Sequence, residues 1–197
     1  MDQEIQKQPS PWAKRKEIGL FKALFQTIKL VLFSPGDFFA NLEIEKSRSN
    51  PFYFYFIVVL FATAFSLLWS NLFFKNFAIN PLEHPLQLLF VPVIVVGSLY
   101  IGAAIIHLGV MIFKGKGGFR GTFNVLSYAA AGRIFSIVPI VGDIVGGIWS
   151  LTATIIGFKK IHKLSTARAI FVYLLIILIL FILLMVLSLI MPQPQRK

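Results

Sequence analysis

The sequence predicts an all-α, polytopic membrane protein: five transmembrane helices preceded by an amphipathic interfacial helix. Three observations lead to this fold class: long uncharged apolar runs, short basic loops between them, and a composition that is 57% hydrophobic and only 14% charged. The run at residues 169–191 carries no charge, and a bilayer-spanning helix needs roughly 20 apolar residues. A soluble domain would carry more charge on its surface, so the chain is expected to fold in lipid.

Residues 1–50 form a polar and basic segment before the first span. Apolar side chains recur in it at helical spacing, at Ile18, Phe21, Phe25, Ile28 and Leu32. This pattern is typical of a helix in the membrane interface, with Gln26 and Thr27 turned away from the apolar stripe. Its expected membrane-surface residues are Lys14, Arg15, Lys16, Lys22 and Lys29. Docking of this helix on a protein partner is the alternative. Pro35 must end the helix, because proline disfavours helix at the preceding residue.

The membrane domain is expected at residues 51–191, followed by a short polar tail at 192–197. Pro51 is a favourable first residue for the first span, and polar or basic loops separate the others. We expect spans at residues 51–73, 86–113, 122–140, 143–158 and 169–191. The third span is the least hydrophobic, because it carries Ser127, Tyr128, Arg133 and Ser136.

The distribution of basic residues predicts the topology. Most of the 19 Lys and Arg residues lie before the first span or in the loops at 114–120 and 159–168. The opposite side holds Lys75, Arg196 and Lys197. The positive-inside rule therefore places the N-terminus in the cytoplasm and the C-terminus outside. The net charge of +11 is then explained by loops facing anionic lipid head groups, and no nucleic-acid partner is expected.

Small side chains recur every four residues along the fourth span, at Gly142, Gly146, Ser150 and Thr154. Such a stripe lets helix backbones approach closely in a membrane, where the hydrophobic effect does not drive helices together. We expect it to pack the third and fourth spans into a tight hairpin. A substrate groove is the alternative.

Arg133 and Asp143 are the notable charges of the spans, since an ionisable side chain inside a membrane is costly and is a functional candidate. We expect them to form a polar clamp, although Asp143 also suits the N-cap of the fourth span. His107 is expected to hydrogen-bond a neighbouring helix. The candidate intramembrane polar cluster is Arg133, Asp143, Tyr128 and His107.

The residue chemistry predicts no enzyme. The chain has no cysteine, which excludes disulfides, thiol nucleophiles and cysteine-ligated metals. The three histidines, His84, His107 and His162, are expected to lie too far apart to bind a metal. We therefore expect no catalytic residue, no cofactor and no metal.

Several local patterns occur in a characteristic order along the chain: Phe33-Ser34-Pro35 with Phe38-Phe39, Gly117-Gly118-Phe119, Leu126-Ser127-Tyr128, Val138-Pro139-Ile140-Val141-Gly142, and Ile161-His162-Lys163-Leu164-Ser165. In this order they resemble the Yip domain family of Ypt/Rab-interacting membrane proteins, in its bacterial branch. The eukaryotic members carry an acidic-Leu-Tyr-Gly motif where this chain has Phe33-Ser34-Pro35-Gly36. Rab recognition is therefore not carried over.

The resemblance implies a non-enzymatic integral membrane protein, an adaptor or a membrane-organising scaffold, in the bacterial cytoplasmic membrane. The alternative is a small transporter, channel or lipid-handling protein with a polar site at the third and fourth spans. The expected partners are membrane lipid with anionic head groups at the cytoplasmic face and either another membrane protein or a second copy of the chain.

Overall fold

The computed structural model describes residues 7–45, 47–73 and 85–190. In these ranges the regular elements are helices, together with one isolated parallel bridge between Gln8 and Leu42. The elements are α1 Arg15–Ile18, α2 Leu20–Phe33, α3 Pro35–Asn41, α4 Ser49–Phe73, α5 Pro85–Ile112, α6 Gly118–Ala129, the 3₁₀ helix η1 Ala130–Ile137, α7 Val141–Ile161 and α8 Thr166–Ile190. The all-helical class is confirmed for this part of the chain. Lys75, His84, Arg196, Lys197 and the tail at 192–197 lie outside the described residues.

Helices long and apolar enough to cross a membrane account for three of the predicted spans: α4, the Val93–Ile112 part of α5, and α7. The apolar stretch found in α8, Thr166–Ile179, is shorter. The third predicted span is not one continuous α-helix, because α6 ends at Ala129 and the chain continues as η1. The five-span count therefore stays a prediction.

The predicted interfacial segment, whose apolar residues run from Ile18 to Leu32, is not one continuous helix. Gly19 has a φ of 91°, a conformation that suits glycine, and it separates α1 from α2. Pro35 occupies the first turn of α3, and α2 ends two residues before it. Proline is favourable there because the first helical positions have no intrahelical partner for their N–H groups.

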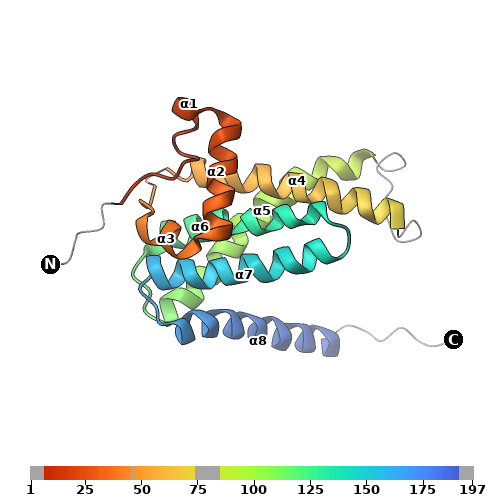
Figure 1. The fold of residues 1–197 in the computed structure, drawn as a ribbon. Helices are drawn as coiled ribbons and strands as arrows, with labels where there is room; N and C mark the ends of the chain where they lie inside the picture. The colour runs from red at the N-terminus through yellow and green to blue at the C-terminus, as the bar shows by residue number, and fades with distance from the viewer. Residues whose placement is uncertain (1–6, 46, 74–84, 191–197) are drawn as a thin grey trace.

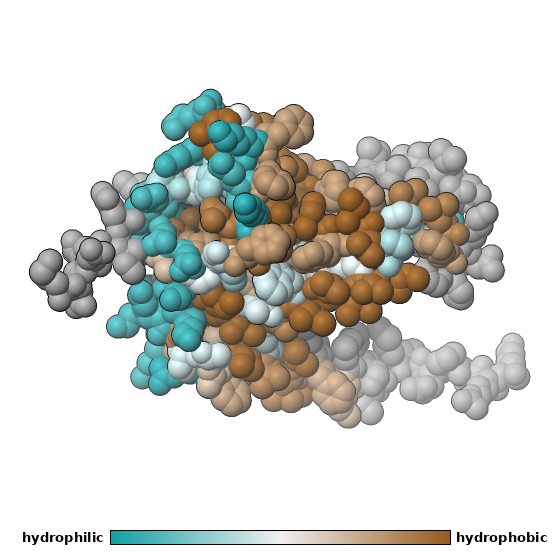
Figure 2. Space-filling view, in the orientation of Figure 1, coloured by the Kyte–Doolittle hydropathy of each residue, from teal (hydrophilic) through white to brown (hydrophobic). Residues whose placement is uncertain are grey.

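The long helices α4, α5, α7 and α8 run along one another, and α2 crosses them (Figure 1). The α5–α6 and α7–α8 connections meet at one end of the bundle, where the Lys116 amide donates to the His162 carbonyl oxygen at 3.0 Å. Figure 2 shows hydrophilic residues gathered at that end and apolar residues along the rest of the visible bundle. We call it the basic end, and the end with the η1–α7 turn the far end.

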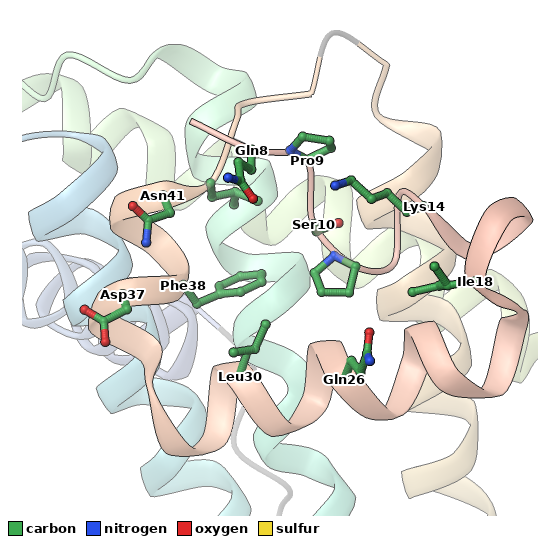
Figure 3. Close-up of a pocket in the computed structure, with 12 residues that line it drawn as sticks. Gln8, Pro9, Ser10, Lys14, Ile18, Gln26, Leu30, Asp37, Phe38 and Asn41 are labelled. Atoms are coloured by element: carbon green, nitrogen blue, oxygen red, sulfur yellow. The ribbon is translucent and has the colours of Figure 1, made fainter. Parts of the chain in front are cut away.

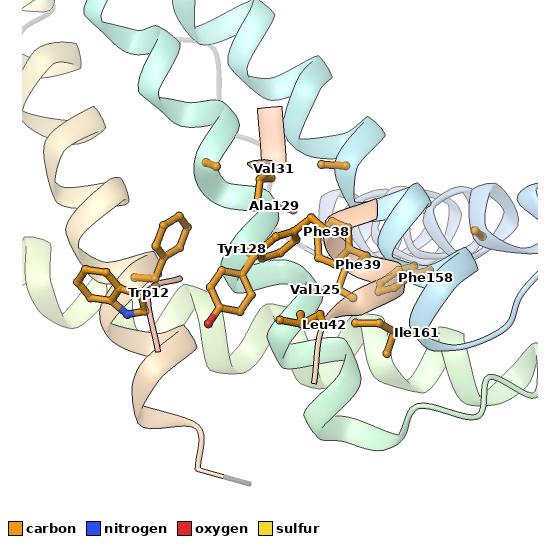
Figure 4. Close-up of a cluster of buried hydrophobic side chains, with 14 of the residues drawn as sticks. Trp12, Val31, Phe38, Phe39, Leu42, Val125, Tyr128, Ala129, Phe158 and Ile161 are labelled. Carbon is orange, nitrogen blue, oxygen red and sulfur yellow. The ribbon is translucent and has the colours of Figure 1, made fainter. Parts of the chain in front are cut away.

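The segment before α4 packs into the same hydrophobic core as the long helices. Trp12, Phe38 and Phe39 are almost fully buried with Phe54 of α4 and Phe158 of α7 (Figure 4). The Trp12 and Phe54 rings meet edge to face, with centroids 6.0 Å apart. Residues on both sides of position 50 therefore contribute to one packed core.

The backbones of η1 and α7 approach each other closely at their glycines. A Cβ atom on Gly146 would lie 2.7 Å from the Gly132 carbonyl oxygen, and one on Gly142 would overlap the Phe135 carbonyl oxygen. Ser150 lies on the same face, since its Oγ would be 2.7 Å from a Cβ on Gly132. Gly142, Gly146 and Ser150 thus form the face of α7 that meets η1. Thr154, one turn further on, is buried and donates to the Ser150 carbonyl oxygen.

This contact predicts different effects at two adjacent glycines. Gly146→Ala should destabilise the protein by about 1–3 kcal/mol, the usual cost of overpacking. Gly147→Ala is the matched control, because nothing lies within 4 Å of its Cβ position and alanine favours helix over glycine. Thermal unfolding in detergent should give a lower midpoint for Gly146→Ala alone. Equal midpoints for the two variants would contradict the close approach.

Candidate functional site

The structure does not bring the four residues of the predicted intramembrane cluster together. Tyr128 and His107 belong to two separate hydrogen-bonded groups at the basic end, and Asp143 belongs to a third at the far end. Arg133 is exposed on η1. The single cluster of the sequence prediction is therefore replaced by three polar junctions, each of which joins different parts of the chain.

The first junction surrounds Tyr128, which is fully buried on α6. Its hydroxyl donates to Glu45 Oε1 at 2.7 Å and lies 2.8 Å from Ser10 Oγ. The rings of Phe38 and Phe54 pack against its ring, with centroid distances of 5.3 and 5.2 Å. One phenol thus connects α6 with the N-terminal segment and with the linker before α4. A buried hydroxyl needs such partners, because leaving it unpaired costs about 1–3 kcal/mol.

Two further hydrogen bonds hold the N-terminal segment against the start of α4. Trp12 Nε1 donates to the Asn50 carbonyl oxygen, and Arg15 donates to Asn50 Oδ1, both at 2.8 Å. The Arg15 guanidinium also lies 4.9 Å from the centroid of the Trp12 ring, a cation–π contact. Arg15 is one of the predicted membrane-surface residues; in the structure its guanidinium binds the protein itself, and its contact with lipid stays a prediction.

The second junction joins α5, α6 and the end of α7 through His107, Thr122 and His162. His162 Nδ1 accepts a hydrogen bond from the Gly117 amide at 3.1 Å, so in a neutral ring the proton is on Nε2. Nε2 then donates to Thr122 Oγ1 at 3.1 Å, and Thr122 donates to His107 Nδ1 at 2.9 Å. In this order Thr122 Oγ1 accepts one hydrogen bond and donates one, and His107 Nδ1 is the final acceptor.

The expectation that these histidines lie far apart is wrong for His107 and His162, whose ring centroids are 6.3 Å apart. They meet because α5 and α7 both end at the basic end, where the α5–α6 turn folds against His162. A Cβ on Gly117 would lie 3.0 Å from His162 Nδ1, so glycine lets the turn approach the ring. In the described ranges, no group of three or more His, Asp or Glu side chains is placed to hold a metal.

The third junction, at the far end, involves Asp143 in the first turn of α7. Its carboxylate accepts hydrogen bonds from Ser66 of α4, at 3.2 Å, and from Ser136 of η1. Trp69 Nε1 donates to the Ser136 carbonyl oxygen at 3.0 Å. Asp143 is thus bound by two hydroxyls and is favourably placed near the positive end of the α7 dipole.

The predicted roles of Asp143 and Arg133 need correction. The N-cap position of α7 is Ile140, and no side chain caps that helix end. No hydrogen bond or ion pair joins Arg133 to Asp143 among the residues that the structure describes. Gly132 takes the position that faces Gly146 of α7, and the next residue, Arg133, lies exposed.

Helix α2 presents two different faces. Ala23, Thr27 and Val31 are fully buried against the protein, whereas Phe21 and Phe25 are 83% and 67% exposed. Thr27, predicted to lie away from the apolar stripe, is on the face opposite Phe21 and Phe25: it is buried, and its hydroxyl donates to the Ala23 carbonyl oxygen at 2.8 Å. Small side chains dock α2 on the chain's own bundle, and large aromatic ones remain outside.

The basic residues around α2 differ in their surroundings. Lys16, Lys22 and Lys29 are exposed. Lys14 is half-buried and lines a pocket of about 370 Å³ between the N-terminal segment, α2 and α3 (Figure 3). This pocket, like the roles of Ser10, Glu45, Thr122 and His162, was missed from the sequence. These residues lie far apart along the chain, and no local sequence pattern indicates that they meet.

Comparison with known proteins identifies one family. The model of the Yip1 domain matches residues 29–188, which begins within α2 and continues into α8. No curated protein and no solved structure matches the chain.

The His162 junction predicts a pH-dependent stability. Burial, and next the neighbouring His107, lower the pKa of His162 from 6.5 to about 4. Because the folded pKa is depressed, the unfolded chain binds more protons between these values. Stability contributed by neutral His162 should thus be complete above pH 6.5 and fall as the pH drops towards 4. Thermal midpoints in detergent between pH 8 and 4 measure this.

The variant His162→Gln supplies the control for this pH dependence. It should be less stable than the native protein at pH 8, because the hydrogen bonds to Gly117 and Thr122 are disturbed. Its midpoint should also change less between pH 6.5 and 4, because the titrating group is gone. An unchanged pH profile in His162→Gln would refute the assignment of this titration to His162.

Proposed function

The chain belongs to the Yip1 domain family, and from this premise we propose that it is a non-enzymatic scaffold that organises the membrane around it. The observation that carries the proposal is the placement of α2. This helix crosses the direction of the long helices (Figure 1), docks through small side chains and exposes Phe21, Phe25 and Phe33.

In this proposal α2 lies in the plane of the membrane, at the interface of one leaflet. When α4, α5 and α7 cross the bilayer, a helix that runs across them is parallel to its surface. The exposed phenylalanines enter the boundary between head groups and acyl chains, and Lys22 and Lys29 extend to the lipid phosphates. A helix inserted into one leaflet expands that leaflet, and binding of this kind depends on membrane curvature.

The proposed topology places the basic end in the cytoplasm and the C-terminus outside, in the cytoplasmic membrane of a bacterium. It is supported by the meeting of two basic connections at one end of the bundle, where the Lys116 amide donates to the His162 carbonyl oxygen. One connection holds Lys114 and Lys116, and the other holds Lys163 and follows Lys159 and Lys160 in the last turn of α7. Basic loops favour the cytoplasmic side. In this topology α6 with η1 is the third span, and α8 is the fifth.

We also propose that this scaffold binds partners within the membrane. The exposed side chains of α7, which include Ile144 and Ile148, are available to lipid, to another membrane protein or to a second copy of the chain. Anionic lipid at the cytoplasmic face is the proposed lipid partner of the exposed lysines.

The proposal predicts that removing the exposed aromatic side chains of α2 abolishes membrane deformation. Native protein reconstituted into giant vesicles at increasing density should draw tubules, and Phe21→Ser/Phe25→Ser should not. The double variant should keep the native thermal midpoint, because both side chains lie mostly outside the protein. Fluorescence microscopy of the vesicles gives the readout.

The matched control is Leu72→Ser/Phe73→Ser, which removes two side chains of similar nature, 55% and 56% exposed, from the end of α4. Its vesicles should deform as those of the native protein do. Equal deformation by native protein and the α2 variant, or loss of deformation in both double variants, would overturn the proposed role of α2.

The alternative function is transport, a channel or lipid handling. It is favoured by the exposed Arg133 on a 3₁₀ segment, since broken helices and intramembrane charges mark many transport sites. Against it, Gly132 and Gly146 bring η1 and α7 into backbone contact beside Arg133, which leaves little space between them.

A flux and lipid-scrambling assay in liposomes tests this alternative. Native protein and Arg133→Ala should both give the rate of protein-free liposomes. A native activity that disappears in Arg133→Ala would instead make transport the leading function and Arg133 a site residue.

A further inference from the structure

Two lysines at the basic end have a backbone conformation that is unusual for lysine. Lys114 has a φ of 59° and Lys163 a φ of 57°, in the left-handed region that glycine enters without steric cost. Each lies two residues after the last residue of its helix, α5 or α7. Helices commonly end with a glycine at this position. Lysine therefore has a free-energy cost at both sites that glycine would avoid.

The fold needs the positive φ at Lys114 but not its side chain. The Lys114 amide donates to the Met111 carbonyl oxygen and the Gly115 amide to the Val110 carbonyl oxygen, both at 2.9 Å, which closes the end of α5 as in a Schellman motif. The side chains of Lys114 and Lys163 are exposed, and they form no ion pair within residues 7–45, 47–73 and 85–190. Strained backbone of this kind is typical of functional positions, so these side chains indicate a role outside the fold.

The two lysines belong to connections that touch each other. The Lys116 amide donates to the His162 carbonyl oxygen at 3.0 Å, and Lys163 directly follows His162. Asp143 is the one acidic residue in the sequence from 85 to 190, and it lies at the far end. The connections thus present positive charge without a carboxylate of their own. Their exposed cations, which we call the cationic seam, are Lys114, Lys116, Lys163 and Arg168.

Apolar surface begins directly beside the cationic seam, where the end of α5 meets the start of α8 (Figure 1). On α5, Met111 and Ile112 are 56% and 63% exposed. On α8, Ile170 and Phe171 are 41% and 53% exposed. The Phe113 and Phe171 rings stack with centroids 6.4 Å apart, so the two apolar surfaces adjoin. A ligand at this place meets cations and apolar side chains together, which favours a lipid over a soluble anion.

We propose that the cationic seam binds one diphosphate lipid of the cardiolipin type, whose acyl chains lie along α5 and α8. One phosphate faces Lys114 of the first connection, and the other faces Lys163 and Arg168 of the second. Two phosphates are inferred because the cations come from two connections and no carboxylate opposes them. Basic sites between helices on the cytoplasmic side suit such head groups. The site deepens the proposed function, because it rests on the placement of the basic end at the membrane surface.

The experiment measures lipid retention by the full-length protein, purified in detergent, with native mass spectrometry. The probes are cardiolipin, phosphatidylglycerol, which carries one phosphate, and phosphatidylethanolamine, which carries no net charge. The native protein should retain cardiolipin in preference to both. Inorganic pyrophosphate at equal concentration should not displace it, because the acyl chains contribute to binding. Displacement would instead show a site for soluble diphosphates and overturn the lipid assignment.

The decisive variant is Lys114→Gly/Lys163→Gly, which removes both side chains and suits the backbone better. Cardiolipin binding should weaken roughly twenty-five-fold, about fivefold for each charge near the membrane surface. The thermal midpoint should equal or exceed that of the native protein, because glycine fits the positive φ at both positions. A purely structural role of the lysines would give a lower midpoint.

Two controls separate the position of the charges from their number. Lys114→Arg/Lys163→Arg keeps both charges and should retain cardiolipin as the native protein does. Lys7→Gln removes an exposed charge next to Gln8, which pairs with Leu42 after α3, away from the cationic seam. It should also bind cardiolipin as the native protein does.

Equal cardiolipin retention by the native protein and the glycine variant would overturn the proposal. So would an equal loss in Lys7→Gln, since that would show a general attraction of anionic lipid. The vesicle assay separates this site from the function on which it rests. Selective cardiolipin retention without membrane deformation would retain the site and reject the scaffold, and deformation without selective retention would do the reverse.

Discussion

The burial of the Tyr128 hydroxyl is the constraint on which the basic end of the structure depends. A phenol in the middle of a packed core must find hydrogen-bond partners, and here they come from Ser10 and Glu45. These two residues belong to the N-terminal segment and the linker, so satisfying one side chain positions both. The aromatic rings of Phe38 and Phe54 complete the enclosure. Ser10 also lines the pocket, so the shape of the pocket depends on this contact.

Small side chains determine how the helices approach one another. In η1 and α7 they are Gly132, Gly142 and Gly146, which allow backbone contact. On α2 they are Ala23 and Thr27, which dock this helix and leave its phenylalanines outside. Large apolar side chains are therefore free to face lipid. In a membrane this arrangement is favourable, because lipid-facing apolar surface carries no hydrophobic cost.

The sequence predicted the helical class, the approximate positions of α4, α5 and α7, and the gathering of basic connections at one end. Each of these features depends on the composition or charge of a long stretch of sequence, and both can be read without knowing which residues meet in the fold. It did not predict that residues 122–137 are divided between α6 and η1, nor which polar residues meet. Arg133 and Asp143 are ten positions apart in a region expected to form a hairpin. Opposite charges at this spacing therefore predict an ion pair between them. Ser66 and Ser136 are the partners that the structure places at Asp143 instead.

What the sequence determined by itself is the nature of the chain: helical, apolar, basic at its connections, and matched to the Yip1 domain over residues 29–188. Only the tertiary structure decided which polar groups meet. His107 and His162 are 55 residues apart, and Ser10 and Tyr128 are separated by 118. Contacts of this separation depend on how helices cross and which faces they bury, and a hydropathy pattern contains neither. The pocket arises in the same way, from three segments that are each unremarkable in sequence.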